Sequence, residues 1–375
     1  MDPRKLIRPQ VRGFQPYLPG RSIESVQREL GLKQIIKLAS NENPLGPSAR
    51  AVTAIRKAGK KLFLYPDGAS TSLRAAIALK YDVTADRVII GAGSDELIEL
   101  LGKTFLNPGD SIVVSDHAFI RYRMAGELMG AEVIRVPMRH YTHDLLAMAA
   151  AIRDDTKLVF IANPNNPTGT YNSSRELAGL LSQVRKLNAR RPQPVLVVAD
   201  EAYYDYAVAF QRDYPDSLKL QKDFPFLVTL RTFSKAYALA GLRVGYGISD
   251  PEIIAALDRV RPPFNVSALG QVGAEASLGD GAQTKRAVQL VASERKKVLS
   301  GLSKLGIPVV PSAGNFALLD MSPRRGADVF ESLMNRGIIV RSMDEYGFPN
   351  HIRVTYGLPG ENQLFLKALK EVVKQ

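Results

Sequence analysis

Short apolar runs alternate with amphipathic stretches through the middle of the chain. Two runs, 195–199 and 227–230, are apolar throughout, which is typical of strands buried on both faces of a sheet. Further strands are predicted at 87–90, 111–115, 132–136 and 157–162, and helices at 95–102, 120–130 and 174–187. This alternation predicts an α/β fold with a mostly parallel sheet flanked by helices.

The pattern changes towards the end of the chain. A long helical stretch is predicted from about 268 to about 305, followed by shorter elements at 315–319 (strand), 327–335 (helix), 338–341 (strand), 351–355 (strand) and 361–373 (helix). Before residue 40, only a short helix near 22–30 is predicted. We therefore expect residues 1–47 to form an arm and part of a small domain, 48–262 a large domain that holds the site, and 263–375 a small α+β domain with a long connecting helix.

The composition excludes several kinds of functional site. The 375 residues include no cysteine and four histidines, which excludes disulfides and thiol nucleophiles and predicts no metal site. Neither a membrane span nor a secretory signal is apparent, so we expect a cytoplasmic protein with no membrane partner. The net charge is +13, but the basic residues are scattered in short groups. They favour anionic ligands over nucleic acid.

Polar residues directly follow the predicted strand 227–230, among them Thr232, Ser234 and Lys235. A lysine there can hold an aldehyde cofactor as an imine, although a solvated loop lysine is the alternative for this residue alone. Eight residues further on, Arg243 offers a planar fork of donors to a phosphate group. Together these residues favour a phosphorylated aldehyde ligand.

Asp200 and Asn166 each follow a predicted strand of the same sheet. Asp200 can pair with the protonated nitrogen of a pyridine ring and so raise the pKa of that nitrogen, or it can simply cap a helix. Tyr203 and Asn166 can reach a ring oxygen, although the residues around Asn166 would also form a plain turn. Because ligands gather at the carboxyl ends of parallel strands, we expect these side chains to share one site.

A glycine-containing turn, with Ser94 at its end, leads from the predicted strand 87–90 into the predicted helix 95–102, which begins at Asp95. Helix N-termini bind phosphate through their free N–H groups. A dinucleotide fingerprint would need glycine where Glu96 stands, and a P-loop ending at residues 102–104 would need glycine where Leu97 stands, so both nucleotide hypotheses fail. Phe119, after the next strand, can stack on a flat ring or pack in the core.

Two arginines lie near the ends of predicted strands in the tail. Arg341 and Arg353 are 353 − 341 = 12 residues apart. Facing one cavity, they would bind a doubly charged anion, whereas on the surface they would have no such role.

In this order, the motifs resemble the class I and II aminotransferases of pyridoxal phosphate (PLP) fold type I. They are Asn-Pro-Thr-Gly at 166–169, Asp-Glu-Ala-Tyr at 200–203, Ser-Lys at 234–235 and Gly-Leu-Arg-x-Gly at 241–245. Within that family, the strings at 17–20, 41–47, 65–68, 141–145, 231–235 and 263–266 are similar to those of the histidinol-phosphate aminotransferases. Aromatic aminotransferases share many of these strings.

The resemblance implies a role for each matching residue. Lys235 would form the imine with PLP and move a proton between the substrate and the cofactor. Asp200 would pair with the ring nitrogen, and Tyr203 and Asn166 would both form hydrogen bonds with the ring oxygen. The phosphate and its cradle would involve Ser94, Asp95, Thr232, Ser234 and Arg243, with Glu96 nearby and Tyr65 reaching over from a second subunit. The substrate pocket would be lined by Tyr17, Asn43, Arg341 and Arg353.

The resemblance also implies partners and leaves alternatives. It implies a homodimer with shared sites that transfers an amino group between histidinol phosphate and 2-oxoglutarate. The phosphate of the first and a carboxylate of the second would bind the same two arginines in turn. The alternatives are an aromatic amino-acid aminotransferase, a PLP-dependent decarboxylase of a phosphorylated amino acid, and a non-catalytic regulator, for whose DNA-binding domain the N-terminal segment is too short. One departure is Phe119, where the family often has tyrosine. The loss of that hydroxyl predicts a modest change in rate or cofactor affinity.

Overall fold

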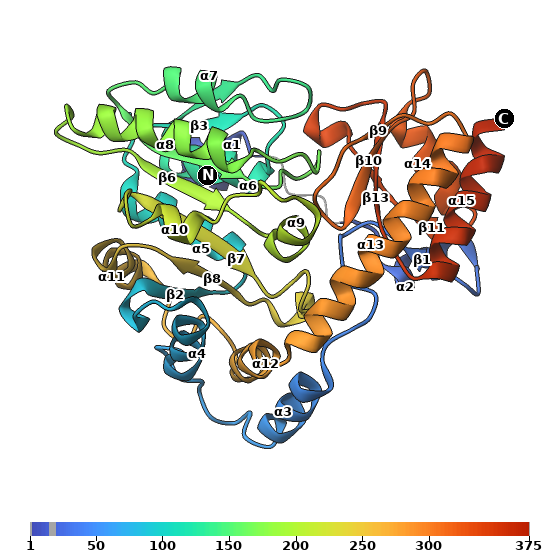
Figure 1. Ribbon diagram of the computed structural model, residues 1–375, viewed down its shortest axis with the longest axis horizontal. Helices are drawn as coiled ribbons and strands as arrows, with labels where there is room; N and C mark the ends of the chain where they lie inside the picture. The colour runs from blue at the N-terminus through green and yellow to red at the C-terminus, as the bar shows by residue number, and fades with distance from the viewer. Residues whose placement is uncertain (1, 15–19, 375) are drawn as a thin grey trace.

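The computed structural model describes residues 2–14 and 20–374. A seven-stranded sheet dominates the larger domain, on the left in Figure 1. Its strands, in spatial order, are β2 (Val88–Gly91), β8 (Gly245–Ile248), β7 (Leu227–Thr232), β6 (Leu196–Asp200), β5 (Thr156–Ala162), β3 (Ser111–Ser115) and β4 (Glu132–Val136). Strand β8 runs antiparallel to both neighbours, and the other pairs are parallel. The predicted mostly parallel sheet is confirmed, with β8 as an addition.

Helices cover both faces of this sheet, because alternate side chains of each buried strand point to opposite faces. One apolar cluster joins the sheet to α5 (Ser94–Phe105), α6 (Ile120–Met129) and α11 (Pro251–Val260). The opposite cluster joins it to α7 (Leu145–Ala150) and α8 (Ser174–Asn188). Helix α8 shows why these segments are helical, since its buried residues Leu177, Leu180, Leu181 and Val184 lie on one face, and a capping box closes its first turn.

Further helices complete the larger domain. At its β2 edge, α3 (Ala49–Gly59), α4 (Thr71–Tyr81) and α12 (Ala268–Leu278) share a buried cluster. Other short helices, of seven residues or fewer, occur in both domains. They are η1 (Pro3–Leu6), α1 (Pro9–Arg12), η2 (Ala85–Arg87), α9 (Tyr204–Phe210), α10 (Ser217–Leu220), η3 (Ala240–Leu242) and η4 (Asp344–Tyr346).

The C-terminal part of the chain forms the smaller domain together with residues 23–37, on the right in Figure 1, whereas α1 near the N-terminus packs against α6 of the larger domain. Its antiparallel sheet has the order β12 (Arg341–Ser342), β13 (His351–Thr355), β10 (Phe316–Asp320) and β9 (Val309–Val310). Beside it, β1 (Ile36–Lys37) pairs in parallel with β11 (Ile338–Ile339). The helices around these sheets are α2 (Ile23–Leu30), α13 (Gly281–Lys304), α14 (Gly326–Met334) and α15 (Pro359–Lys374). The predicted smaller α+β domain is confirmed.

Two predicted elements prove to be wrong in detail. The helix expected over 268–305 is two helices, because the chain turns at Gly279 and the Asp280 side chain then caps α13 by accepting from the Gln283 N–H. The strand expected over 338–341 is two short strands that belong to different sheets, β11 with β1 and β12 with β13. This division places Arg341 in the same sheet as Arg353.

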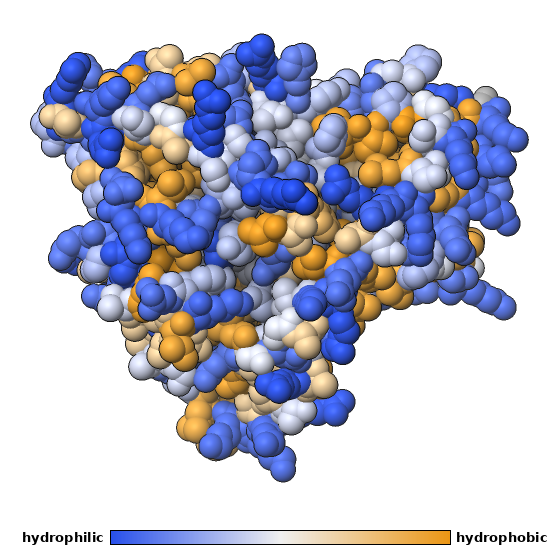
Figure 2. Space-filling model, in the orientation of Figure 1, coloured by the Kyte–Doolittle hydropathy of each residue, from blue (hydrophilic) through white to orange (hydrophobic). Residues whose placement is uncertain are grey.

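The surface is mostly polar and is interrupted by hydrophobic patches, as Figure 2 shows for one face. Hydrophobic atoms are visible at the lower end of that view, in the region where Figure 1 places α3. Just beyond α3, the side chains of Leu62, Phe63, Leu64 and Tyr65 are all exposed. Within residues 2–14 and 20–374, no helix is long and apolar enough to cross a membrane.

Candidate active site

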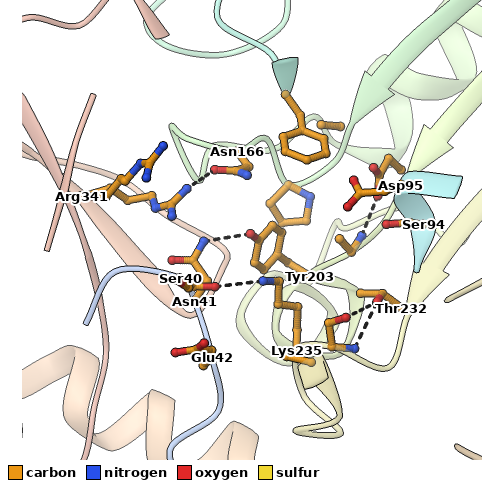
Figure 3. A pocket seen from close by; sticks show the side chains of 18 of the residues that line it. Ser40, Asn41, Glu42, Ser94, Asp95, Asn166, Tyr203, Thr232, Lys235 and Arg341 are labelled. Atoms are coloured by element: carbon orange, nitrogen blue, oxygen red, sulfur yellow. Dashed lines mark hydrogen bonds between the residues drawn. The ribbon is translucent and has the colours of Figure 1, made fainter. Parts of the chain in front are cut away.

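A cavity of about 280 Å³ opens where the larger domain meets the smaller one. Its walls include the carboxyl ends of β5, β6 and β7, the start of α5, and the β12 and β13 strands of the smaller sheet. Figure 3 shows its arrangement. Arg341 and Asn166 lie on one side, Ser94, Asp95 and Thr232 on the other, and Tyr203 and Lys235 between them. The cavity therefore has two polar ends with a lysine amine between them.

Lys235 lies just past β7 and points into this cavity. Its Nζ donates a hydrogen bond of 3.1 Å to the Ser40 carbonyl, on the segment that leads from β1. Removal from water, together with the positive charge of Arg353, lowers the pKa of Lys235 to about 8. At neutral pH a useful fraction of this amine is therefore uncharged and nucleophilic.

Asp200 is the last residue of β6 and is 5% exposed. Its carboxylate accepts hydrogen bonds from the Tyr122 hydroxyl (2.8 Å) and from the Ala202 N–H (3.1 Å). Burial raises the pKa of Asp200 to about 6, and the bond from Tyr122 opposes that rise. A buried carboxylate with no ion pair among the described residues suits a ligand that brings a positive charge.

The ring-oxygen candidates are held by side chains from distant parts of the sequence. The Tyr203 hydroxyl accepts a hydrogen bond of 2.8 Å from Asn41 Nδ2. Asn166 Oδ1 accepts from Arg353 Nη1, which leaves the amide N–H groups of Asn166 as its donors. Both residues line the cavity, so they can donate to an oxygen bound between them.

The end of the cavity at α5 is a cradle for an anion. Ser94 and Asp95 begin the helix, and Arg243 lies beside them, with its Nη2 3.4 Å from Asp95 Oδ2. Thr232 and Ser234 add hydroxyls, joined by a bond of 3.0 Å. A side chain at Gly93 would come within 2.4 Å of Arg243 Nη2. Only glycine therefore allows the guanidinium to approach this helix N-terminus so closely.

The opposite end carries the two predicted arginines. Arg341 and Arg353 face each other across the β12–β13 pair and both line the cavity. Arg353 is 8% exposed and also donates to the Ala39 carbonyl at 2.7 Å. Arg341 pairs with Glu345, which shares the lining. Two guanidinium groups at one end can bind a second anion.

Comparison with known proteins decides the family. Residues 33–369 match the model of the aminotransferases of class I and II. The chain belongs to this family. It is 47% identical to a histidinol-phosphate aminotransferase of Moorella thermoacetica, over 98% of this chain and 92% of the relative, and 45% identical to one of Anaeromyxobacter, over 98% and 99%.

Solved structures of aminotransferases agree with this fold. The histidinol-phosphate aminotransferase of Sinorhizobium meliloti, solved in complex with pyridoxal 5′-phosphate, superposes with a TM-score of 0.87 at 27% identity and covers 98% of this chain and 97% of its own. The donor set of the present cavity fits that cofactor. It offers an amine, a buried carboxylate, two ring-oxygen donors and a glycine-lined anion cradle.

Three of the described residues that were singled out from the sequence are not among those that line this aminotransferase cavity. Glu96 accepts from the Ala92 N–H and from Asn265 Nδ2, both at 2.6 Å, and so braces the turn before α5. Asn43 donates to the Ala236 carbonyl at 2.9 Å, next to Lys235 in the chain. Tyr65 is 83% exposed and stacks on Phe264. Tyr17 lies outside the described residues.

Several lining residues were not singled out from the sequence. Asn41 belongs to the segment 41–47, whose sequence resembles that of the histidinol-phosphate aminotransferases but suggests no particular role for this residue. For Glu345, the sequence shows only that it lies four residues after Arg341. Tyr122 follows Phe119 by one helical turn, and the two rings meet edge to face with centroids 5.8 Å apart. Phe119 itself lines the cavity as expected for a ring-stacking residue.

Proposed function

We propose that this aminotransferase transfers the amino group of L-histidinol phosphate to 2-oxoglutarate, with PLP as cofactor, giving imidazole-acetol phosphate and L-glutamate in histidine biosynthesis. The observation that carries the proposal is the pair of arginines at the end of the cavity opposite the α5 cradle. One anion site suits the cofactor phosphate, and the other suits a substrate whose far end is also an anion. The names of the relatives at 41–47% identity support the same substrate.

At the cofactor end, the protein's task is to bind and orient. PLP, when bound, supplies an aldehyde that links to amines and a ring that draws electrons from the substrate's Cα. The α5 N–H groups, Arg243 and the Thr232 and Ser234 hydroxyls would hold its phosphate. Phe119 would pack on its ring, Asp200 would hold a negative charge at the ring nitrogen, and Tyr203 and Asn166 would donate to the ring oxygen.

Lys235 would both anchor the cofactor and move protons at the substrate. Its uncharged form would hold the cofactor aldehyde, and the Lys235 amine would accept the proton from the substrate Cα. A pKa of about 8 suits an amine that must accept and release a proton near neutral pH. The Ser40 carbonyl, 3.1 Å from Nζ, holds this amine at the side of the cavity facing β1.

At the substrate end, Arg341 and Arg353 would bind the phosphate of histidinol phosphate in one half-reaction and a carboxylate of 2-oxoglutarate in the other. A single anion site for both substrates is consistent with an enzyme that binds them in turn. The anion would take the place of Glu345 beside Arg341.

We also propose that two copies assemble with shared sites. The exposed apolar segment 62–65 and the stacked Tyr65–Phe264 pair support this, because contiguous exposed hydrophobic residues mark interaction surfaces. Tyr65 would then reach the cofactor phosphate of the other copy. We further propose a cytoplasmic location, where a biosynthetic aminotransferase meets its substrates. We also propose the division of the chain at 47/48 and 262/263, with α12 of the last segment packed on the larger domain.

The experiment that tests the substrate is a comparison of amino donors with 2-oxoglutarate as acceptor. We expect kcat/KM to be highest for histidinol phosphate, compared with phenylalanine. Arg341→Gln should raise KM for histidinol phosphate by about 10- to 100-fold, because a hydrogen bond to a charged group contributes about 1.5–3 kcal/mol. Arg325→Gln is the matched control, since Arg325 pairs with Asp344 and is not among the lining residues.

A preference for phenylalanine would instead identify an aromatic aminotransferase. Release of carbon dioxide from a phosphorylated amino acid without any acceptor would identify a decarboxylase. Either result would overturn the proposed substrate.

A further inference from the structure

Tyr122 lies at the base of the cavity, where its hydroxyl meets Asp200. It is 1% exposed, on the first turn of α6, and Asp200 ends β6, 78 residues further along the chain. The O–O distance is 2.8 Å, which is typical of a hydroxyl donating to a carboxylate. None of the sequence motifs includes this tyrosine.

The Tyr122 ring is itself held rigidly. It stacks on Phe160 of β5, with centroids 4.9 Å apart and ring planes at 10°, and it meets the edge of Phe119. A ring fixed in this way holds the hydroxyl oxygen of Tyr122 beside the Asp200 carboxylate. Tyr122 therefore touches both residues expected to hold the cofactor ring, Phe119 beside it and Asp200 at its nitrogen.

We propose that Tyr122 is a positioning residue that holds the Asp200 carboxylate in place and in its charged form for the ring nitrogen of the cofactor. The proposal rests on PLP as the cofactor but not on histidinol phosphate as the substrate.

The surroundings of Asp200 explain why such a donor is needed. Burial raises the pKa of Asp200, and the nearby carboxylates of Asp95 from α5 and Glu201 from the next position raise it further. Lys235 lies across the cavity, beyond β7. The hydrogen bonds from Tyr122 and from the Ala202 N–H act in the opposite direction. Removing the hydroxyl should thus raise the pKa of Asp200 and leave more of it protonated at neutral pH.

The test uses Tyr122→Phe, which removes the hydroxyl and keeps the ring. The Kd for PLP is measured from pH 6 to pH 8.5 by the circular dichroism of the bound cofactor. We expect the Kd of the variant to be about tenfold higher at neutral pH and to approach the wild-type value at the alkaline end, where Asp200 is charged in both proteins. A merely structural defect would raise the Kd equally at every pH.

Tyr206→Phe is the matched control. Its hydroxyl is buried and makes no hydrogen bond in the structure, so its loss should leave the Kd for PLP unchanged. A second arm combines Tyr122→Phe with Asp200→Asn, in which residue 200 no longer titrates. In the Asp200→Asn background, Tyr122→Phe should add no pH-dependent change to the Kd for PLP.

Two results would overturn the proposal. One is a wild-type Kd for Tyr122→Phe across the pH range, and the other is an equal effect of Tyr122→Phe in the Asp200→Asn background. If the single variant does not fold, the paired Asp200→Asn proteins still decide between the outcomes. Failure of the wild-type protein to bind PLP at any pH would overturn the proposed cofactor as well, whereas a different amino donor would leave the role of Tyr122 intact.

Discussion

At Lys235 the surroundings disfavour a positive charge, since desolvation and the Arg353 charge both lower its pKa, to about 8. An exposed lysine would be almost fully protonated at neutral pH and would bind an aldehyde slowly. The position of Lys235 past the buried strand β7 is therefore as important as its chemical type. The sequence could place the residue after the strand, but the approach of Arg353 from β13 depends on the folded chain.

Lys235→Ala should remove the cofactor's covalent attachment and lower kcat by about 10³-fold or more, because the anchoring amine and the proton carrier are lost together. The measurement is borohydride reduction of the PLP-loaded protein, followed by mass spectrometry of its peptides. Lys103→Ala is the control, since Lys103 pairs with Glu99 on α5 and is not among the lining residues. A cofactor-modified peptide that contains another lysine would contradict the assignment.

At the scale of elements, the strands and helices of the larger sheet follow from the apolar pattern, and the site follows from the motifs at their carboxyl ends. Strand β8 was not foreseen, because the string Gly-Tyr-Gly-Ile has no continuous apolar run. The bond from Tyr122 to Asp200 was not foreseen either, because it joins α6 to β6. Local pattern predicts an element, whereas contacts between distant elements depend on how the chain packs.

One such contact predicts how stability depends on pH. His143 is fully buried, between Ser115 at the end of β3 and the carbonyl of Ala162 at the end of β5. Desolvation lowers its pKa to about 4, below the roughly 6.5 of an unfolded chain. Protonation therefore favours unfolding, and the stabilisation is complete above about pH 6.5 and is lost as the pH falls towards 4.

We expect the free energy of unfolding to fall by up to about 3 kcal/mol across that interval because of His143 alone. The measurement is the thermal midpoint from pH 4 to pH 7 for the wild type and for His143→Gln. The variant should lose less stability over this range. Identical slopes in the two proteins would show that folding does not lower the pKa of His143 and would contradict this prediction.

At the scale of the whole molecule, the cavity opens between a domain built from the middle of the chain and one that combines the C-terminal part with an early segment around β1. Residues 36–37 pair with residues 338–339, so the segment that carries Ser40 and Asn41 reaches the cavity from the smaller domain. The exposed apolar segment 62–65 lies in the larger domain, between α3 and α4. The proposed dimer would cover it.

Phe63→Glu should shift the protein from about 82 kDa, twice the 41.1 kDa of one chain, towards the mass of one chain, because a charge buried in an apolar contact is costly. Light scattering measures the mass. Leu146→Glu is the control, as Leu146 is also exposed but lies on α7. A wild-type protein of single-chain mass would contradict the shared-site proposal.

The most direct test of the proposed transamination is a half-reaction in which PLP-loaded protein meets histidinol phosphate with no acceptor present. We expect the absorbance band of the bound cofactor to disappear once, in proportion to the enzyme, and to return when 2-oxoglutarate is added. A band that persists with histidinol phosphate but disappears with phenylalanine would contradict the proposed substrate. The absence of any cofactor band in the starting protein would contradict the role of Lys235 and the PLP chemistry built around it.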